Sequence, residues 1–268
     1  MAEKGQIRIA LAGNPNCGKT TMFNNITGAK QHVGNYAGVT VEKKEGHTNF
    51  DGHELLFIDL PGTYSLTARS LDELVARNVI VNDNPDVIVN VLDASNLERN
   101  LYLAAQLLEL EKPMVIALNM ADVAEEMGIK YDLKKMAEMT GATIVSTVGR
   151  TNIGTKELLE ATVSVAASQK APGVTINYGD LLEGKISELV ELLKQAGTVT
   201  YPLRWIAVKL LEKDADVIGK VMRFDNTEAV IQKAEAIREE IKDQVDLDIV
   251  FQEYRHRFAV EVYNTCLT

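Results

Sequence analysis

The sequence has few cysteines and no long apolar segment. Its 268 residues include two cysteines, Cys17 and Cys266, which lie far apart and have no metal-type spacing. This usage is typical of a reducing compartment and excludes a disulfide-stapled scaffold. No apolar run is long enough to cross a bilayer, and the N-terminus lacks the apolar region of a signal peptide. We therefore expect a soluble chain that is not exported.

Basic residues are also scarce. The chain has 28 Lys and Arg against 38 Asp and Glu, which gives a net charge of −10 at pH 7. An extended nucleic-acid surface needs clustered basic side chains, so this balance argues against nucleic acid as a partner, although not against a small basic pocket. The hydrophobic content of 46% is enough for a full core, and the length accommodates two domains.

Up to about residue 168, short β-branched runs alternate with longer amphipathic segments. This alternation predicts an α/β domain with a mostly parallel sheet covered by helices. Asp51-Gly52 is a tight hairpin signal, so the strands that flank it should be antiparallel. Six strands are expected, over 7–12, 41–50, 54–59, 87–93, 114–119 and 143–146, with helices over 19–27, 70–82, 97–110, 133–140 and 155–167.

Beyond a linker at 169–179, strand signals nearly vanish. Asp180 and Glu183 resemble a capping box, and Gly197 is a helix stop signal. The apolar stripes expected to face a core are Leu182, Ile186, Leu189, Val190 and Leu193 in this helix, and Val230, Ala234, Ile237 and Ile241 further on. Further helices are expected over 202–211, 215–222, 227–245 and 247–266. We predict a first domain at 1–168 and a small all-α domain at 180–268.

The segment from Gly13 to Thr20 reads G-x-x-x-x-G-K-[ST], the pattern of a phosphate-binding loop. It lies between an expected strand and an expected helix, as this motif requires; a glycine-rich turn that matches by chance is the alternative. Backbone N–H groups would converge on phosphates, Lys19 adds a full charge, and Thr20 offers a hydroxyl to Mg²⁺. The residues expected here are Gly13, Asn14, Pro15, Asn16, Cys17, Gly18, Lys19, Thr20 and Thr21.

A second motif, Asp59-Leu60-Pro61-Gly62, ends the third expected strand. Its carboxylate can hold Mg²⁺ through water, and the N–H of Gly62 can meet a γ-phosphate. Turns of this composition are common. Its position after a phosphate loop and a second apolar strand is what gives the motif weight.

Asn119-Met120-Ala121-Asp122 follows the fifth expected strand. The Asp122 carboxylate can accept paired hydrogen bonds from N1–H and the exocyclic amine of guanine, a donor pair that adenine lacks. The alternative is that Asn119 and Asp122 only cap the next helix. After the last expected strand, Ser146, Thr147 and Val148 can back the base with main-chain N–H groups.

The loop from His32 to Glu42 contains glycines and has Thr40 near its end. Such a loop can be ordered by a γ-phosphate and Mg²⁺ and released after hydrolysis. We expect Gly38, Val39 and Thr40 to contact nucleotide, with Thr40 as a second hydroxyl ligand of Mg²⁺. A mobile connection without such a role is the alternative.

Two other groups of side chains have a less specific pattern. Cys17 lies near Lys19, which could lower its thiol pKa and make it redox-sensitive; the alternative is a small side chain packed in a tight loop. His32, His47, His53 and His256 share no ligand spacing with one another or with a cysteine. We therefore expect no iron site in this chain.

The residues within these motifs are more specific than the general P-loop pattern requires. The segments 13–24, 33–42 and 59–66 closely resemble the N-terminal region of the ferrous iron transport protein B (FeoB) family of bacteria and archaea, P-loop GTPases of the TrmE-Era-like class. This resemblance implies a Ras-like P-loop GTPase domain. The linker and helical segment match, in size and helicity only, the spacer that follows in that family, sometimes called a guanine-nucleotide dissociation inhibitor domain.

The resemblance also implies an activity and partners. Family members continue into a multi-span membrane region, so we expect a soluble fragment of a transporter at the cytoplasmic face of a prokaryotic inner membrane. It would bind GTP and GDP and report the nucleotide state through the helical domain to the membrane-embedded remainder of the same polypeptide. Small cytosolic iron-transport accessory proteins and further copies of the chain are other expected partners.

The resemblance assigns catalytic roles to Lys19, Thr40, Gly62 and Asn16. Mg²⁺ would be held by Thr20, Thr40 and Asp59. Family members with Asn at the position of Asn16 resemble potassium-activated GTPases, in which that side chain helps to hold K⁺. The alternative is that Asn16 only braces the loop.

Thr63 stands where Ras-like GTPases commonly place Gln, and it cannot orient the attacking water in the same way, so we expect slow intrinsic hydrolysis. Three interpretations stay open. The chain is the regulatory GTPase module of a membrane iron transporter, or a free-standing GTPase of ribosome or tRNA maturation, or an interaction scaffold with a catalytically idle switch domain. The acidic balance and the helical tail disfavour the second.

Overall fold

The computed structural model describes residues 5–197 and 200–268, which divide into two compact units. The first unit runs through Val174 and also contains Ala259–Thr268, and the second comprises Thr175–Phe258. The first is an α/β unit and the second is helical, as the sequence predicts.

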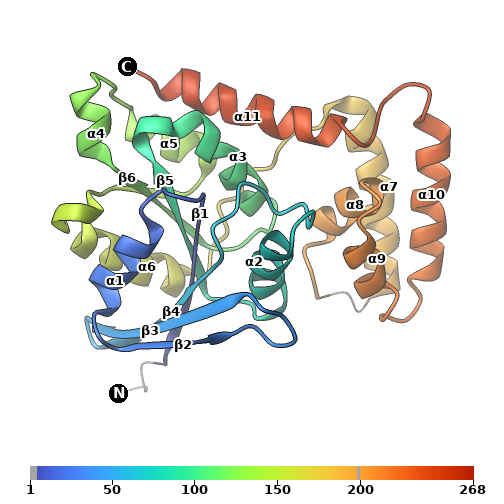
Figure 1. Ribbon diagram of the computed structural model, residues 1–268. Coiled ribbons are helices and arrows are strands. Elements are labelled where there is room, and N and C mark those ends of the chain that lie inside the picture. Colours follow the sequence, from blue (N-terminus) through green and yellow to red (C-terminus); the bar gives the residue numbers. More distant parts are fainter. Residues whose placement is uncertain (1–4, 198–199) are drawn as a thin grey trace. The chain divides into compact units, whose positions relative to one another are not determined.

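The α/β unit is built on a seven-stranded sheet, counted over the described residues (Figure 1). Its strands are β1 (Ile7–Gly13), β2 (Gln31–Asn35), β3 (Glu42–Phe50), β4 (His53–Asp59), β5 (Val87–Asp93), β6 (Met114–Asn119) and β7 (Thr143–Ser146). They lie in the order β2-β3-β4-β1-β5-β6-β7. Neighbours from β4 to β7 pair parallel, whereas β2, β3 and β4 pair antiparallel.

The predicted hairpin joins β3 to β4. Asp51 and Gly52 have φ values of 48° and 73°. Positive φ at both central residues is the geometry of a type I′ turn, which matches the right-handed twist of the two strands. Antiparallel pairing then runs from Phe50 opposite His53 to Lys44 opposite Asp59, which places Asp59 at the end of a paired strand.

The sheet has one strand more than the six expected, because Gln31–Asn35 forms β2 at its edge. All five residues are exposed, and Val33 is the only large apolar side chain among them. The segment therefore has no hydrophobic alternation that would indicate a strand. Backbone pairing with β3 is what forms it, and the predicted switch loop is shorter than expected at its N-terminal side.

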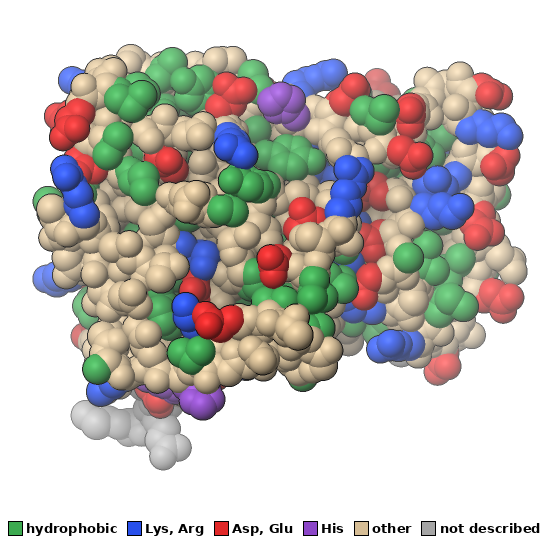
Figure 2. Space-filling model, in the orientation of Figure 1, with side chains coloured by type: hydrophobic (Ala, Val, Ile, Leu, Met, Phe, Trp, Pro, Cys, Tyr) green, Lys and Arg blue, Asp and Glu red, His purple; other side chains and the backbone are tan. Residues whose placement is uncertain are grey.

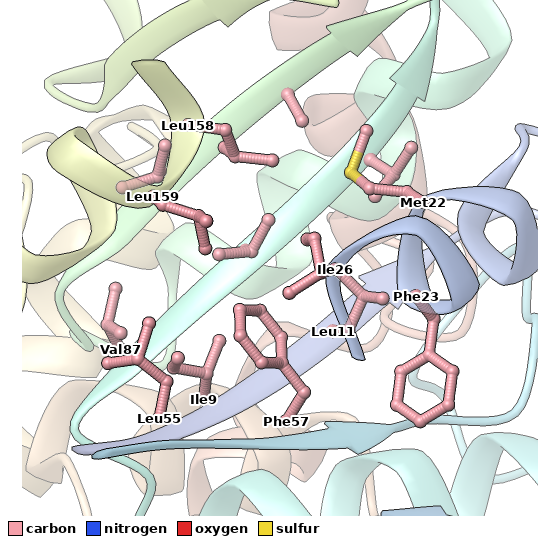
Figure 3. Close-up of a cluster of buried hydrophobic side chains, with 14 of the residues drawn as sticks. Ile9, Leu11, Met22, Phe23, Ile26, Leu55, Phe57, Val87, Leu158 and Leu159 are labelled. Atoms are coloured by element: carbon pink, nitrogen blue, oxygen red, sulfur yellow. The ribbon is translucent and has the colours of Figure 1, made fainter. Parts of the chain in front are cut away.

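Helices α1 (Lys19–Thr27) and α6 (Thr155–Ser168) pack against one face of the sheet. In Figure 3, Ile9 and Phe57 from the strands lie with Ile26 of α1 and Leu158 of α6 in one buried cluster. Helices α2 (Leu71–Asn82) and α3 (Leu97–Leu108) contact β1 and β5. The remaining elements of the unit are α4 (Ala121–Glu126), α5 (Leu133–Thr140) and short 3₁₀ turns at Ala94–Asn96 and Gly149–Thr151. Of these, α4 was not expected.

The helical unit contains α7 (Gly179–Ala196), α8 (Leu203–Leu211), α9 (Ala215–Val221), α10 (Glu228–Ile241) and the first part of α11 (Val250–Cys266). The two predicted stripes are buried, except that Val190 is half-buried. Glu183 does reach back to the start of α7, but it accepts the N–H of Tyr178 at 2.8 Å, and Asp180 lies in the first turn. Gly197 ends the helix in the left-handed conformation, as expected.

Among the described residues, no helix combines the length and the apolar character that crossing a bilayer requires.

Candidate functional site

The loop between β1 and α1 is shaped by close packing around its glycines. Gly18 has a φ of 87°, and a Cβ there would collide with the side-chain nitrogen of Asn119. A Cβ at Gly13 would lie 2.7 Å from the sulfur of Cys17 and from the carbonyl oxygen of Val91. Only glycine fits at either position. Because α1 begins at Lys19, its unpaired N–H groups open onto this loop.

Asn119 connects three loops at the end of the sheet. Its Nδ2 donates to the carbonyl oxygen of Cys17 at 2.9 Å. Its Oδ1 accepts the N–H of Gly149 at 2.9 Å and the hydroxyl of Thr147 at 3.3 Å. Helix α4 begins after Met120 without a side-chain cap. Asn119 therefore braces the phosphate loop against the loop after β7, rather than capping the next helix.

Asp122 lies in the first turn of α4, three residues after Asn119. Its Oδ2 accepts a hydrogen bond from Nε of Arg150 at 2.6 Å. Desolvation raises the pKa of the Asp122 carboxyl, but the hydrogen bond and charge of Arg150 and nearby backbone N–H groups together outweigh it, so that the pKa lies below its ordinary value. The side chain is thus an ionised acceptor at neutral pH. Arg150 was not among the predicted site residues.

Asp59 ends β4 and forms a buried ion pair with Lys19. A cavity of about 490 Å³ beside this pair is also lined by Thr40 and Gly62. A second cavity, of about 400 Å³, is lined by Asn14, Pro15, Asn16, Gly18, Lys19, Thr20, Thr21, Gly62 and Met120. Lys19 and Gly62 line both, so the two cavities adjoin at these residues. Together they form a depression along the phosphate loop.

The loop before β3 is attached to this depression through Tyr36, which the sequence analysis missed. The Tyr36 side chain is buried, and its hydroxyl donates to the carbonyl oxygen of Asp59 at 3.3 Å. Burial raises the pKa of Tyr36 above its ordinary value. Of the three residues predicted to contact nucleotide on this loop, Thr40 lines one of the two cavities, whereas Gly38 and Val39 line neither. A tyrosine within a glycine-containing loop was the available signal.

The segment after Gly62 contacts the phosphate loop and α3. The N–H of Thr63 donates to the carbonyl oxygen of Gly13 at 3.3 Å, and the Thr63 side chain is buried. The ring of Tyr64 lies 4.2 Å from the guanidinium of Arg99. Asn14 in turn donates to the carbonyl oxygen of Arg99 at 3.4 Å. The phosphate loop and the segment after it thus share contacts with the start of α3.

Cys17 is a packed side chain rather than a reactive one. It is 1% exposed, and burial raises the pKa of its thiol to about 11 although Lys19 lies nearby. A buried thiol with this pKa is protonated at neutral pH, which agrees with the packing alternative and gives no support to a redox-sensitive site. Within residues 5–197 and 200–268, no three His, Cys, Asp or Glu side chains are grouped as metal ligands.

The donor set around the cavities fits a hard cation. Thr40 and Asp59 line the first cavity and Thr20 the second, and all three offer oxygen atoms. Oxygen donors suit Mg²⁺, whereas the imidazole and thiolate ligands that zinc prefers are not among them. Ser146, by contrast, is exposed and lines neither cavity, while Thr147 and Val148 are buried and line neither cavity either.

The sheet order, the phosphate loop after β1, the aspartate after β4 and the Asn119–Asp122 loop after β6 define a Ras-like P-loop GTPase domain, which a helical unit accompanies. The chain belongs to the ferrous iron transport protein B family. The model of that family matches residues 7–162, and the model described as the FeoB cytosolic helical domain matches residues 178–268.

Curated relatives are longer proteins. The Fe(2+) transport protein A/Fe(2+) transporter FeoB fusion protein of Porphyromonas gingivalis is 46% identical over 216 residues, which cover 79% of this chain and 26% of that protein. The Fe(2+) transporter FeoB of Escherichia coli (strain K12) is 40% identical over 216 residues, covering 78% and 27%. The chain therefore spans about a quarter of the length of the relatives it matches.

Solved structures of family members are similar along the whole chain. A GDP-bound mutant of the S. thermophilus FeoB G-domain has a TM-score of 0.89 at 36% identity, over 98% of this chain and 100% of that one. The cytosolic domain of T. maritima FeoB has a TM-score of 0.85 at 30% identity in its apo form, over 98% and 100%. Its GMPPNP form has a TM-score of 0.86 at 31% identity, over 98% and 99%.

Proposed function

We propose that this chain is the GTP-binding and GTP-hydrolysing regulatory part of a prokaryotic ferrous iron membrane transporter. The observation that carries the proposal is Asn119, which lies just before Asp122 and bonds to the phosphate loop and to the loop that bears Thr147, beside two adjoining cavities. Family membership supports the same conclusion, since the similar T. maritima structures include GDP and GMPPNP forms.

The residues have distinct roles in this proposal. The backbone N–H groups from Asn14 to Thr20 and the charge of Lys19 hold the β- and γ-phosphates. Gly62 offers its N–H to the γ-phosphate, because it lies against Pro15 of the phosphate loop. Asp122 accepts the two N–H donors of guanine. When phosphates attract Lys19, Asp59 loses its ion-pair partner and becomes available to a cation.

Thr20, Thr40 and Asp59 would hold Mg²⁺, and Asn16 would hold K⁺. These cations, when bound, supply positive charge that offsets the charge developing on the phosphates. The buried Thr63 side chain cannot orient the attacking water as a glutamine does, so intrinsic hydrolysis is slow. We expect main-chain groups of the two switch segments to position that water.

The signalling role extends the proposal to partners. The nucleotide state reorganises residues 35–40 and 63–70, and the helical unit passes this change to the membrane region of the same polypeptide at the cytoplasmic face of the inner membrane. Small cytosolic iron-transport proteins are further partners, and the P. gingivalis relative, named as a fusion of transport protein A with FeoB, supports this. Oligomers of the chain are compatible with the proposal.

Base recognition is tested by Asp122→Asn, which exchanges a carboxylate for an amide. Affinity for GTP should fall about tenfold or more, because guanine donors would face a mismatched group, while affinity for xanthosine triphosphate should rise. Titration with fluorescent nucleotides measures both. Asp132→Asn is the matched control, since Asp132 caps α5 and lines neither cavity. Unchanged guanine preference in Asp122→Asn would contradict the proposal.

The role of Asn16 is tested by comparing GTP turnover in KCl and in NaCl. We expect wild-type turnover to be faster in KCl, and Asn16→Ala to remove this difference while GDP affinity changes little. Equal turnover of the wild-type protein in both salts would remove K⁺ from the mechanism and leave Asn16 as a brace of the loop.

A further inference from the structure

Arg150 occupies the carboxylate that the proposed site needs for guanine. Its Nε lies 2.6 Å from Oδ2 of Asp122, and one terminal nitrogen lies 3.9 Å from Glu126. The Arg150 side chain is 68% exposed, whereas that of Asp122 is 22% exposed. The arginine side chain is therefore mostly exposed, whereas the aspartate that it contacts is largely covered.

The backbone beside Arg150 is attached to the proposed site. The preceding residue, Gly149, donates its N–H to Asn119 at 2.9 Å. Its carbonyl oxygen accepts from Nδ2 of Asn25 in α1 at 2.6 Å. The short 3₁₀ turn at Gly149–Thr151 is thus attached both to Asn119 and to α1, the helix that follows the phosphate loop. The backbone that carries Arg150 is held beside Asp122 whatever its side chain does.

Guanine and Arg150 offer Asp122 the same chemistry. Guanine presents two parallel N–H donors, and a guanidinium also presents several N–H donors in a plane. If the two donors of guanine approach both oxygens of Asp122, one of them competes with Arg150 for Oδ2, the oxygen that Nε of Arg150 now contacts. Adenine presents no such donor pair, so an adenine nucleotide does not displace Arg150.

We propose that Arg150 is an intramolecular competitor of guanine for Asp122, and that it sets the affinity and release rate of GDP and GTP. This inference rests on the proposed function, because it takes Asp122 as the base-reading residue. Binding of guanine requires the fraction of molecules in which the ion pair is open, so the pair weakens apparent affinity by the reciprocal of that fraction. For an exposed ion pair this amounts to a factor of about two to five. During release, Arg150 supplies Asp122 with a new partner as the base leaves.

The experiment measures GDP and GTP affinity and GDP release with fluorescent nucleotides in wild type, Arg150→Ala and Arg150→Lys. Arg150→Ala should bind both nucleotides about two to five times more tightly and release GDP more slowly. The difference in nucleotide affinity between Arg150→Ala and wild type should become smaller as NaCl rises from about 0.05 to 0.5 M, because salt screens the Arg150–Asp122 ion pair. The nucleotide affinity and GDP release rate of Arg150→Lys should lie between those of wild type and Arg150→Ala. Lys156→Ala is the control, since it removes another exposed ion pair, to Glu160 on α6.

A double variant separates competition from a structural effect. In an Asp122→Asn background, Arg150→Ala should leave the affinity for xanthosine diphosphate unchanged, because the ion pair no longer exists. Unchanged or weaker GDP binding in Arg150→Ala alone would overturn the inference, and weaker binding would mean that Arg150 contacts the nucleotide directly. Failure of the wild-type chain to bind GDP would instead overturn the proposed function.

Discussion

Single residues in the helical unit carry buried charge. Glu212 accepts hydrogen bonds from Lys209 at 2.7 Å and from Arg255 at 2.5 Å. Arg255 is completely buried, with Tyr178 5.8 Å from its guanidinium. Burial raises the pKa of Glu212, but the two neighbouring cations outweigh it and bring the pKa to about 2, from 4.5. The acid is therefore held ionised inside the unit.

This pKa predicts a loss of stability in acid. Because the native pKa lies below the unfolded value, the ionised form of Glu212 stabilises the unit above about pH 4.5, and the stabilisation is lost as pH falls toward 2. Urea unfolding followed by the fluorescence of Trp205 measures this, since it is the only tryptophan and lies buried in α8.

Glu212→Gln should lower the free energy of unfolding at pH 7 by about 3–5 kcal/mol, because it removes the charged partner that both Lys209 and the buried Arg255 contact. It should also flatten the dependence on pH in this range. Glu239→Gln is the control, because Glu239 pairs with Lys242 at the surface. An acid dependence in Glu212→Gln equal to that of wild type would show that other groups cause it.

At the scale of elements, one tyrosine anchors the loop between β2 and β3. The hydroxyl of Tyr36 bonds to the end of β4, and its backbone N–H bonds to the carbonyl oxygen of Val41 at 3.0 Å. The carbonyl oxygen of Tyr36 also accepts the N–H of Val39 at 3.2 Å. The turn that presents Thr40 to the cavity is therefore organised around this residue.

Tyr36→Phe should loosen this turn, because it removes one buried hydrogen bond and leaves the carbonyl of Asp59 with one partner fewer. Amide hydrogen exchange of residues 36–41 should become about two to ten times faster. Tyr131→Phe is the matched control, since the Tyr131 hydroxyl also donates to a backbone carbonyl, that of Ala94. Unchanged exchange of the loop would show that its backbone bonds alone hold it.

At the scale of the whole molecule, packing and sequence divide the chain differently at its C-terminus. The sequence indicates one helical segment over 180–268, whereas Ala259–Thr268 packs as part of the α/β unit. Asp132 donates its N–H to the carbonyl oxygen of Cys266 at 2.8 Å, and the rings of Tyr131 and Tyr263 are 6.3 Å apart. Residues 259–268 therefore belong to the α/β unit, whose other residues all precede residue 175.

Deletion of residues 259–268 should destabilise the α/β unit by about 2 kcal/mol or more, because it removes the buried side chains of Ala259, Val262 and Cys266. Thermal release of fluorescent GDP reports the unfolding of this unit, while Trp205 reports the helical unit. A release temperature equal to that of the full chain would contradict this assignment.

Surface charge is also a property of the whole molecule. On the face in Figure 2, acidic and basic side chains of the described residues are intermingled, and they make no broad basic area there. This mixture gives no support to the nucleic-acid-binding interpretation, which requires clustered Lys and Arg.

What the sequence determined by itself was local. Gly13 to Thr20, the Asp51-Gly52 hairpin and the apolar stripe of α10 follow from turn chemistry and periodicity, which act over a few residues. The order of motifs after successive strands also placed Asp59 and Asp122 at one edge of the sheet, since parallel strands share their carboxyl ends.

Only the tertiary structure decided which distant side chains meet. Lys19 pairs with Asp59 across 40 positions, Asn119 bonds to Cys17 across 102, and Arg150 reaches Asp122 across 28. No periodicity links such positions, because their proximity arises from sheet order and loop shape. The same holds for β2, which exists because β3 offers it backbone partners. Its side chains contain no strand pattern.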